Sequence, residues 1–163
     1  MREFRRYSAA IAVFAAVLYA ALVIAIFGLI SLYTDRDVIS DSSVGPVVGP
    51  VMTASSVLLV LFWMLRIALR VPETEQRIAL GPALLLAVVC YLLFCAVGGF
   101  LVGLAAGDPI AFIGFFGRQL TSPFAIAVGI LAFIVCILFM LVLASRVGNK
   151  GRPRWPWENR EDD

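Results

Sequence analysis

The stretch from Ile78 to Ala106, IALGPALLLAVVCYLLFCAVGGFLVGLAA, contains no charged residue. As a helix it would be about 43 Å long at 1.5 Å per residue, which exceeds the roughly 30 Å hydrocarbon core of a bilayer. Gly81-Pro82 suits the first turn of such a helix, where the missing proline N–H costs little, and Gly107-Asp108-Pro109 ends the run. The sequence therefore predicts a membrane-spanning helix over residues 80–106.

Three further apolar runs surround this one, and the 13 Lys and Arg and 11 Asp and Glu lie outside the runs or at their ends. A content of 62% hydrophobic and 15% charged residues excludes an ordinary soluble domain. The first run is too long for the apolar region of a secretory signal, about 7–15 residues, so we expect it to be retained. We predict an all-α integral membrane four-helix bundle over residues 1–147 and a cytoplasmic tail over 148–163, with spans at about 9–32, 46–66, 80–106 and 123–145.

Lys and Arg are distributed unevenly between the predicted spans. Eleven of the 13 lie in the amino terminus, the middle connection and the tail, whereas Arg36 and Arg118 stand alone in the other two connections. The segments on the cytoplasmic side of a membrane carry the excess of Lys and Arg. We therefore expect a plasma membrane protein with both termini in the cytoplasm.

Small residues at four-residue spacing predict where helices approach closely, because lipid gives no hydrophobic drive to helix association. The third span carries Gly99, Gly103 and Gly107, and the first carries Ala12, Ala16 and Ala20. One interpretation is that these residues seat the helices of the bundle against each other. The other is that the glycine residues face a second copy of the chain or a membrane-protein partner.

The polar side chains inside the spans are uncharged. They are two tyrosines near the centres of the first and third spans and three hydroxyl residues in the second, namely Tyr19, Tyr91, Thr53, Ser55 and Ser56. A hydroxyl in hydrocarbon requires a partner, so we expect a hydrogen-bonded cluster within the bundle. The functional alternative is that the cluster lines a narrow path for an uncharged solute.

The groups that ion coupling, acid–base chemistry and metal binding usually require are missing from the spans, since these hold no interior charge and the chain has no histidine. Small multidrug transporters resemble the chain in span number, but their membrane-embedded glutamate has no counterpart here. Cys90, Cys95 and Cys136 lie inside spans without Cys-x-x-Cys spacing, which favours a role as small apolar filler. We expect no enzyme activity, no cofactor and no metal site.

The second external connection holds an apolar segment, residues 110–117, that is too short to span a bilayer. With Asp108 as its cap and Pro109 as its first residue, it is expected to form a short interfacial helix. Its Phe side chains would then lie at the acyl boundary, and Arg118 would point outward. A re-entrant element beside a pore is the alternative, because two glycines leave room for the backbone to turn.

The tail combines cations with aromatic rings at Arg152, Arg154, Trp155 and Trp157. This combination suits an anionic inner-leaflet surface, or a docking peptide for a cytoplasmic partner. The Arg-Pro-Arg-Trp-Pro-Trp-Glu motif, with the Arg-rich start and the Ala-, Val- and Leu-rich bundle, resembles a family of small uncharacterised membrane proteins of high-GC actinobacteria. That resemblance implies a multi-pass bacterial membrane protein and supplies no catalytic residue.

Two classes of function are compatible with these features. The first is a non-enzymatic accessory or assembly protein that binds partners or lipid through its small-residue helix faces and its tail. The second is a small channel or carrier for an uncharged solute. We expect the bilayer and a membrane-protein partner or a second copy of the chain as binding partners, and no nucleic acid.

Overall fold

The computed structural model describes residues 2–34, 47–70 and 80–148 of the chain. These residues form five helices: α1 (Arg2–Thr34), α2 (Val48–Arg70), α3 (Leu80–Ala106), α4 (Pro109–Leu120) and α5 (Pro123–Gly148). All of them except α4 are long and apolar enough to cross a membrane. The predicted fold class, an all-α four-helix membrane bundle with an additional short helix, is therefore confirmed.

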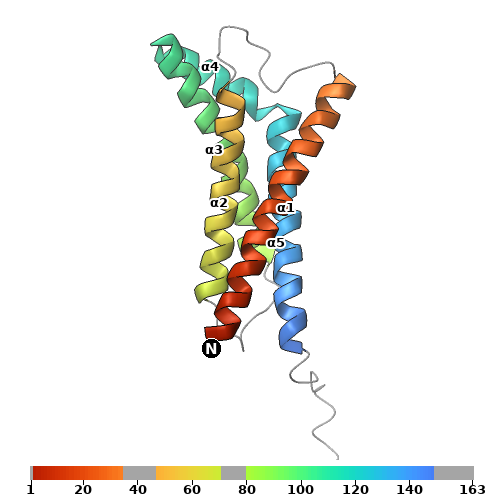
Figure 1. The fold of residues 1–163 in the computed structure, drawn as a ribbon. Helices are drawn as coiled ribbons and strands as arrows, with labels where there is room; N and C mark the ends of the chain where they lie inside the picture. The colour runs from red at the N-terminus through yellow and green to blue at the C-terminus, as the bar shows by residue number, and fades with distance from the viewer. Residues whose placement is uncertain (1, 35–46, 71–79, 149–163) are drawn as a thin grey trace, which may run out of the picture.

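The four long helices form a ring in which each packs against two neighbours, in the order α1, α2, α3, α5 (Figure 1). The start of α1 and the end of α5 lie at one end of this ring, which we call the terminal end, and α4 lies at the other, which we call the α4 end. Because α2 returns to the terminal end, α3 begins there as well. The start of α1, the end of α2, the start of α3 and the end of α5 thus share one side of the bundle.

The centre of the ring is filled by large side chains. Tyr19, Phe94, Phe139, Met52 and Met64 are among the largest residues with almost no exposed surface. Close packing of this kind leaves few voids and holds side chains in single rotamers. The bundle interior is therefore a packed core.

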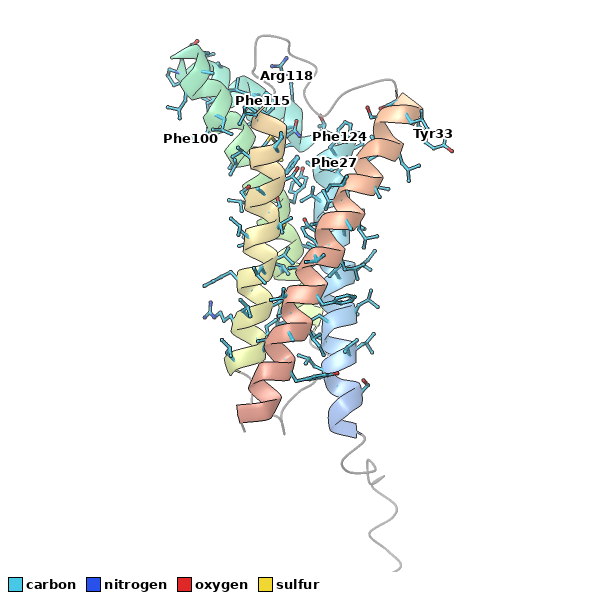
Figure 2. All side chains as sticks on the ribbon, in the orientation of Figure 1. Phe27, Tyr33, Phe100, Phe115, Arg118 and Phe124 are labelled. Carbon is cyan, nitrogen blue, oxygen red and sulfur yellow. The ribbon has the colours of Figure 1, made fainter. Side chains whose placement is uncertain are left out.

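An aromatic contact joins three of the helices toward the α4 end. The Phe27 ring of α1 meets Phe94 of α3 edge to face at a centroid distance of 5.9 Å, and Phe124 of α5 at 5.3 Å. Figure 2 shows Phe27 and Phe124 facing each other between α1 and α5. Such pairs contribute about 0.5–1.5 kcal/mol beyond their area burial.

The connection from α3 to α4 follows from three residues. Gly107 adopts a left-handed conformation with φ of 65°, which favours glycine, and so ends α3. Asp108 then caps α4, because its carboxylate accepts the Ile110 N–H at 2.9 Å, and Pro109 occupies the first turn. The cap and the proline start were both predicted, and both are confirmed.

The helix α4 slants across the α4 end from α3 toward α5 (Figure 1). The expectation that all of its Phe side chains lie at the acyl boundary was wrong. Phe115 is buried and Phe112 lies against α3, whereas Ile110 and Ile113 are the exposed apolar residues. The physical reason is that glycines leave the α3 backbone bare, and flat rings pack closely on a bare backbone.

Candidate functional site

A hydrogen-bonded contact in the middle of the bundle joins all four long helices. The Tyr19 hydroxyl of α1 donates to the Val128 carbonyl of α5 at 3.3 Å and lies 3.3 Å from the Cys90 sulfur of α3. That sulfur lies 3.9 Å from the Ser56 carbonyl of α2. Tyr19, Cys90 and Ser56 have no exposed surface. We call these four residues the Tyr19 node, and its geometry fixes the helices at one common depth.

Cys90 is the member of the node that sequence reasoning missed, since it was expected to act only as apolar filler. A thiol is a weak donor and acceptor, and its position between the Tyr19 hydroxyl and the Ser56 carbonyl lets Cys90 bridge α1 and α2. No local pattern marks it apart from Cys95 and Cys136, which are also buried. Its four-residue offset from Phe94 on α3 places both on the bundle-facing side.

The other polar residues expected in a cluster bond elsewhere. Thr53 donates to the Gly49 carbonyl at 3.0 Å, and Ser55 and Ser56 donate to the Met52 carbonyl at 2.7 and 3.1 Å. These three hydroxyls therefore serve their own helix, α2, and do not face a common path.

Tyr91 has a separate role. Its hydroxyl donates to the Leu120 carbonyl at the end of α4 and does not reach the Tyr19 node. Because the carbonyls of the last turn of a helix lack intrahelical partners, Tyr91 satisfies one of them. Tyr91 thus links the middle of α3 to the junction between α4 and α5.

The three glycines predicted to form one packing surface, Gly99, Gly103 and Gly107, do not share one surface. A Cβ atom at Gly99 would lie 3.1 Å from the Phe112 ring, and one at Gly103 would lie 2.9 Å from the Phe112 Cβ, so α4 covers both. Gly107, in contrast, has open space around it and ends the helix. In this structure Gly99 and Gly103 therefore contact α4 of the same chain. The interpretation that they face a second copy is not supported.

Of the three alanines predicted to pack α1 against its neighbours, two point toward the centre of the ring. Ala12 is completely buried and Ala16 is 3% exposed, whereas Ala20 is only half-buried. Their small size allows α1 to approach α2 and α5, its two neighbours. Ala20 lies at the edge of this contact.

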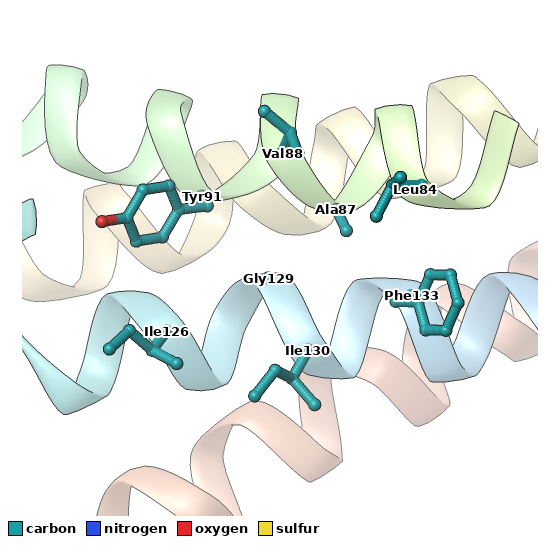
Figure 3. A pocket seen from close by; sticks show the side chains of 8 residues that line it. All are labelled: Leu84, Ala87, Val88, Tyr91, Ile126, Gly129, Ile130 and Phe133. Atoms are coloured by element: carbon teal, nitrogen blue, oxygen red, sulfur yellow. The ribbon is translucent and has the colours of Figure 1, made fainter. Parts of the chain in front are cut away.

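An open groove of about 350 Å³ lies between α3 and α5 on the surface of the bundle (Figure 3). Its floor is formed where Gly129 approaches α3, since a Cβ at this glycine would lie 3.3 Å from both the Ala87 carbonyl oxygen and the Tyr91 Cβ. The lining side chains are apolar except for the tyrosine hydroxyl. They are Leu84, Ala87, Val88, Tyr91, Ile126, Ile130 and Phe133, together with Gly129.

Three buried polar atoms have no hydrogen-bond partner among the described residues. They are Ser8 Oγ, Trp63 Nε1 and Gln119 Nε2, which lie on α1, α2 and α4 respectively. A buried polar group without a hydrogen-bond partner destabilises the fold, so these atoms mark places where the hydrogen bonding of the bundle is incomplete. None of the three lines the groove between α3 and α5.

The remaining predicted features can be placed only in part. Arg118 is exposed and points away from the bundle at the α4 end (Figure 2). Within residues 2–34, 47–70 and 80–148, no three His, Cys, Asp or Glu side chains are grouped as a metal site would require. The tail residues Arg152, Arg154, Trp155 and Trp157 lie outside the described residues.

Similarity to known proteins is found at the level of a family. The model of a family described as "Family of unknown function (DUF6121)" matches residues 1–163, which is the whole chain. No curated protein and no solved structure matches it.

Proposed function

The chain belongs to DUF6121, a family of unknown function, and from the structure we propose that this member is a non-enzymatic accessory protein of the plasma membrane. It binds other components of the membrane through the lipid-facing sides of its bundle. Its tail, in this proposal, adds a contact at the cytoplasmic surface.

The Tyr19 node is the observation that carries this proposal. The Tyr19 hydroxyl and the Cys90 thiol contact neighbouring helices at the centre of the bundle, the hydroxyls of α2 bond within their own helix, and Tyr19, Phe94 and Met52 fill the space. A solute path would instead require hydroxyls that face a common space. The surfaces left for binding are the outer faces of the helices, which carry large exposed side chains such as Phe14 and Phe62.

The proposed orientation places the terminal end of the bundle in the cytoplasm. The support is the uneven distribution of Lys and Arg, which favours the three segments at that end. A bacterial plasma membrane fits the resemblance carried by the tail motif and is part of the same proposal.

Photo-crosslinking in living cells tests the accessory function. A photoreactive amino acid is placed in turn at Phe14 of α1, Phe62 of α2 and Ile130 of α5, all of which are at least half exposed. We expect one face to crosslink reproducibly to one membrane protein, while the other faces give lipid adducts only. Tyr19, which is fully buried, is the matched control and should give neither.

The same experiment can contradict the proposal. If every exposed position gave lipid adducts and the chain were purified alone in mild detergent, the proposal that it binds a partner protein would be contradicted. Solute flux in proteoliposomes that Tyr19→Phe alters would support the channel or carrier instead.

A further inference from the structure

We propose that the groove between α3 and α5 binds one acyl chain of a bilayer lipid, as a defined site separate from any protein partner. The groove lies on the outer side of two membrane-spanning helices, so it faces hydrocarbon. This proposal goes beyond the accessory function, because it holds whether or not the chain has a protein partner.

The chemistry of the groove excludes polar ligands. Its single polar side-chain atom is the Tyr91 hydroxyl oxygen, and that hydroxyl donates a hydrogen bond to the Leu120 carbonyl. A ligand that brought a hydrogen-bond acceptor into the groove would find no free side-chain donor there, which is unfavourable in hydrocarbon. The occupant is therefore apolar along the length of the groove.

The rim of the groove favours an acyl chain over a helix. Leu84, Val88, Ile126 and Ile130 are 59%, 48%, 46% and 54% exposed and stand up along its two sides. Membrane helices associate through small residues that let their backbones approach, and these side chains hold a second backbone away. The small residues Ala87 and Gly129 are at the floor, where α3 and α5 already contact each other.

The length of the groove agrees with a single leaflet. From Leu84 to Tyr91 on α3, and from Ile126 to Phe133 on α5, the lining covers about 10 Å at 1.5 Å per residue. That is about a third of the roughly 30 Å hydrocarbon core. A flexible chain fits this length, whereas a crossing helix would extend far beyond it.

The position of Leu84 identifies the leaflet. It lies one turn after Leu80, the first residue of α3, and α3 begins at the terminal end. Tyr91, at the other end of the lining, follows Cys90 of the Tyr19 node in the middle of α1 and α3, so the chain that enters between Tyr91 and Leu84 belongs to a lipid of the leaflet on the side of the terminal end. The Tyr91 ring lies at the end of the groove opposite Leu84 (Figure 3).

The test uses the full chain in vesicles of phosphatidylcholine that carry a photoreactive diazirine on one acyl chain. After illumination, the labelled residues are mapped by mass spectrometry. We expect the groove residues Val88 and Ile126 to be labelled several-fold more than Phe14 of α1, although Phe14 is more exposed. Such a preference marks a site, since bulk lipid labels residues according to exposure.

Two variants on one helix provide the matched comparison. Ile130→Trp fills the groove and should reduce labelling at Val88 to the level seen at Phe14. Ile134→Trp adds the same ring one turn further along α5, outside the groove and at a similar exposure of 44%, and should leave labelling unchanged. Circular dichroism and the thermal unfolding transition establish that both variants fold.

Each other outcome overturns the proposal. Labelling that follows exposure alone means that the groove holds only exchanging bulk lipid. A crosslink from Val88 to another protein in native membranes means that the groove holds a partner helix, which contradicts the lipid site but supports the accessory function. Uniform labelling together with a protein crosslink at α1 or α2 would contradict only the lipid site and would still support the accessory function.

Discussion

The hydroxyl of Tyr19 lies 3.3 Å from two groups that belong to two other helices, at a depth where a bilayer offers no water. Polar contacts between membrane helices contribute modestly, because the dissociated helices also find partners. The Tyr19 node therefore sets the relative depth of the helices and contributes only modestly to the stability of the bundle.

Tyr19→Phe removes the hydroxyl and keeps the ring. We expect the free energy of unfolding to fall by about 1 kcal/mol, the usual range for an interhelical hydrogen bond in a membrane protein. Tyr33→Phe, at a residue that is 86% exposed, is the matched control and should leave stability unchanged. Unfolding in mixed micelles, followed by circular dichroism, measures both. Equal stability of the two variants would contradict the structural importance of the node.

At the scale of elements, α4 rests on α3 through contacts that the sequence only half revealed. The four-residue spacing of Gly99 and Gly103 predicted a close approach, but not which helix makes it. The reason is physical: α3 is apolar on every side, so no amphipathic stripe separates a lipid-facing from a protein-facing side. The capping residues, in contrast, act locally, and Asp108 and Pro109 could be assigned from their neighbours alone.

Two glycine substitutions in this hairpin should have opposite effects. Gly103→Ala places a Cβ 2.9 Å from the Phe112 Cβ, and we expect a loss of about 1–3 kcal/mol from overpacking. Gly114→Ala, on α4, meets nothing within 4 Å and should stabilise the helix by up to about 1 kcal/mol. Thermal unfolding of the two variants compares them directly. Unchanged or increased stability of Gly103→Ala would show that α4 does not pack closely on Gly103.

The cap of α4 gives a local prediction. Asp108→Ala removes the carboxylate that accepts the Ile110 N–H, and we expect a loss of about 1 kcal/mol that is confined to α4. Hydrogen exchange should accelerate at the amides of α4 and stay constant in α2. Asp108→Asn retains an acceptor and should exchange like the unaltered chain. Faster exchange across all helices would contradict a purely local role.

At the scale of the whole molecule, the fold class followed from hydropathy alone, because only helices satisfy their backbone groups within each segment when they cross lipid. The candidate sites were less predictable. The groove between α3 and α5 depends on which residues of two helices far apart in the sequence meet at Gly129, and the Tyr19 node depends on the registers of four helices. Neither leaves a periodic signal in the chain.

Topology is the prediction that belongs to this scale. Fusions of a reporter that is active only in the cytoplasm should give a signal at both ends of the chain, and a reporter that is active only outside should give a signal after Asp41. The reason is that Lys and Arg favour the terminal end. Alkaline phosphatase and green fluorescent protein serve as the paired reporters. Cytoplasmic activity of the fusion after Asp41 would reverse the orientation, and with it the leaflet that supplies the groove.

The bond from Tyr19 to Val128 joins residues 109 positions apart, in the first and the last long helix. A ribosome makes α1 early and α5 last, so the nascent chain inserts its first span long before the carbonyl that this hydroxyl needs exists. A chain cut before α5 would lack the Val128 carbonyl and leave the Tyr19 hydroxyl with only the Cys90 sulfur, a weak acceptor. We therefore expect membrane proteases to clear chains cut before α5 faster than complete ones.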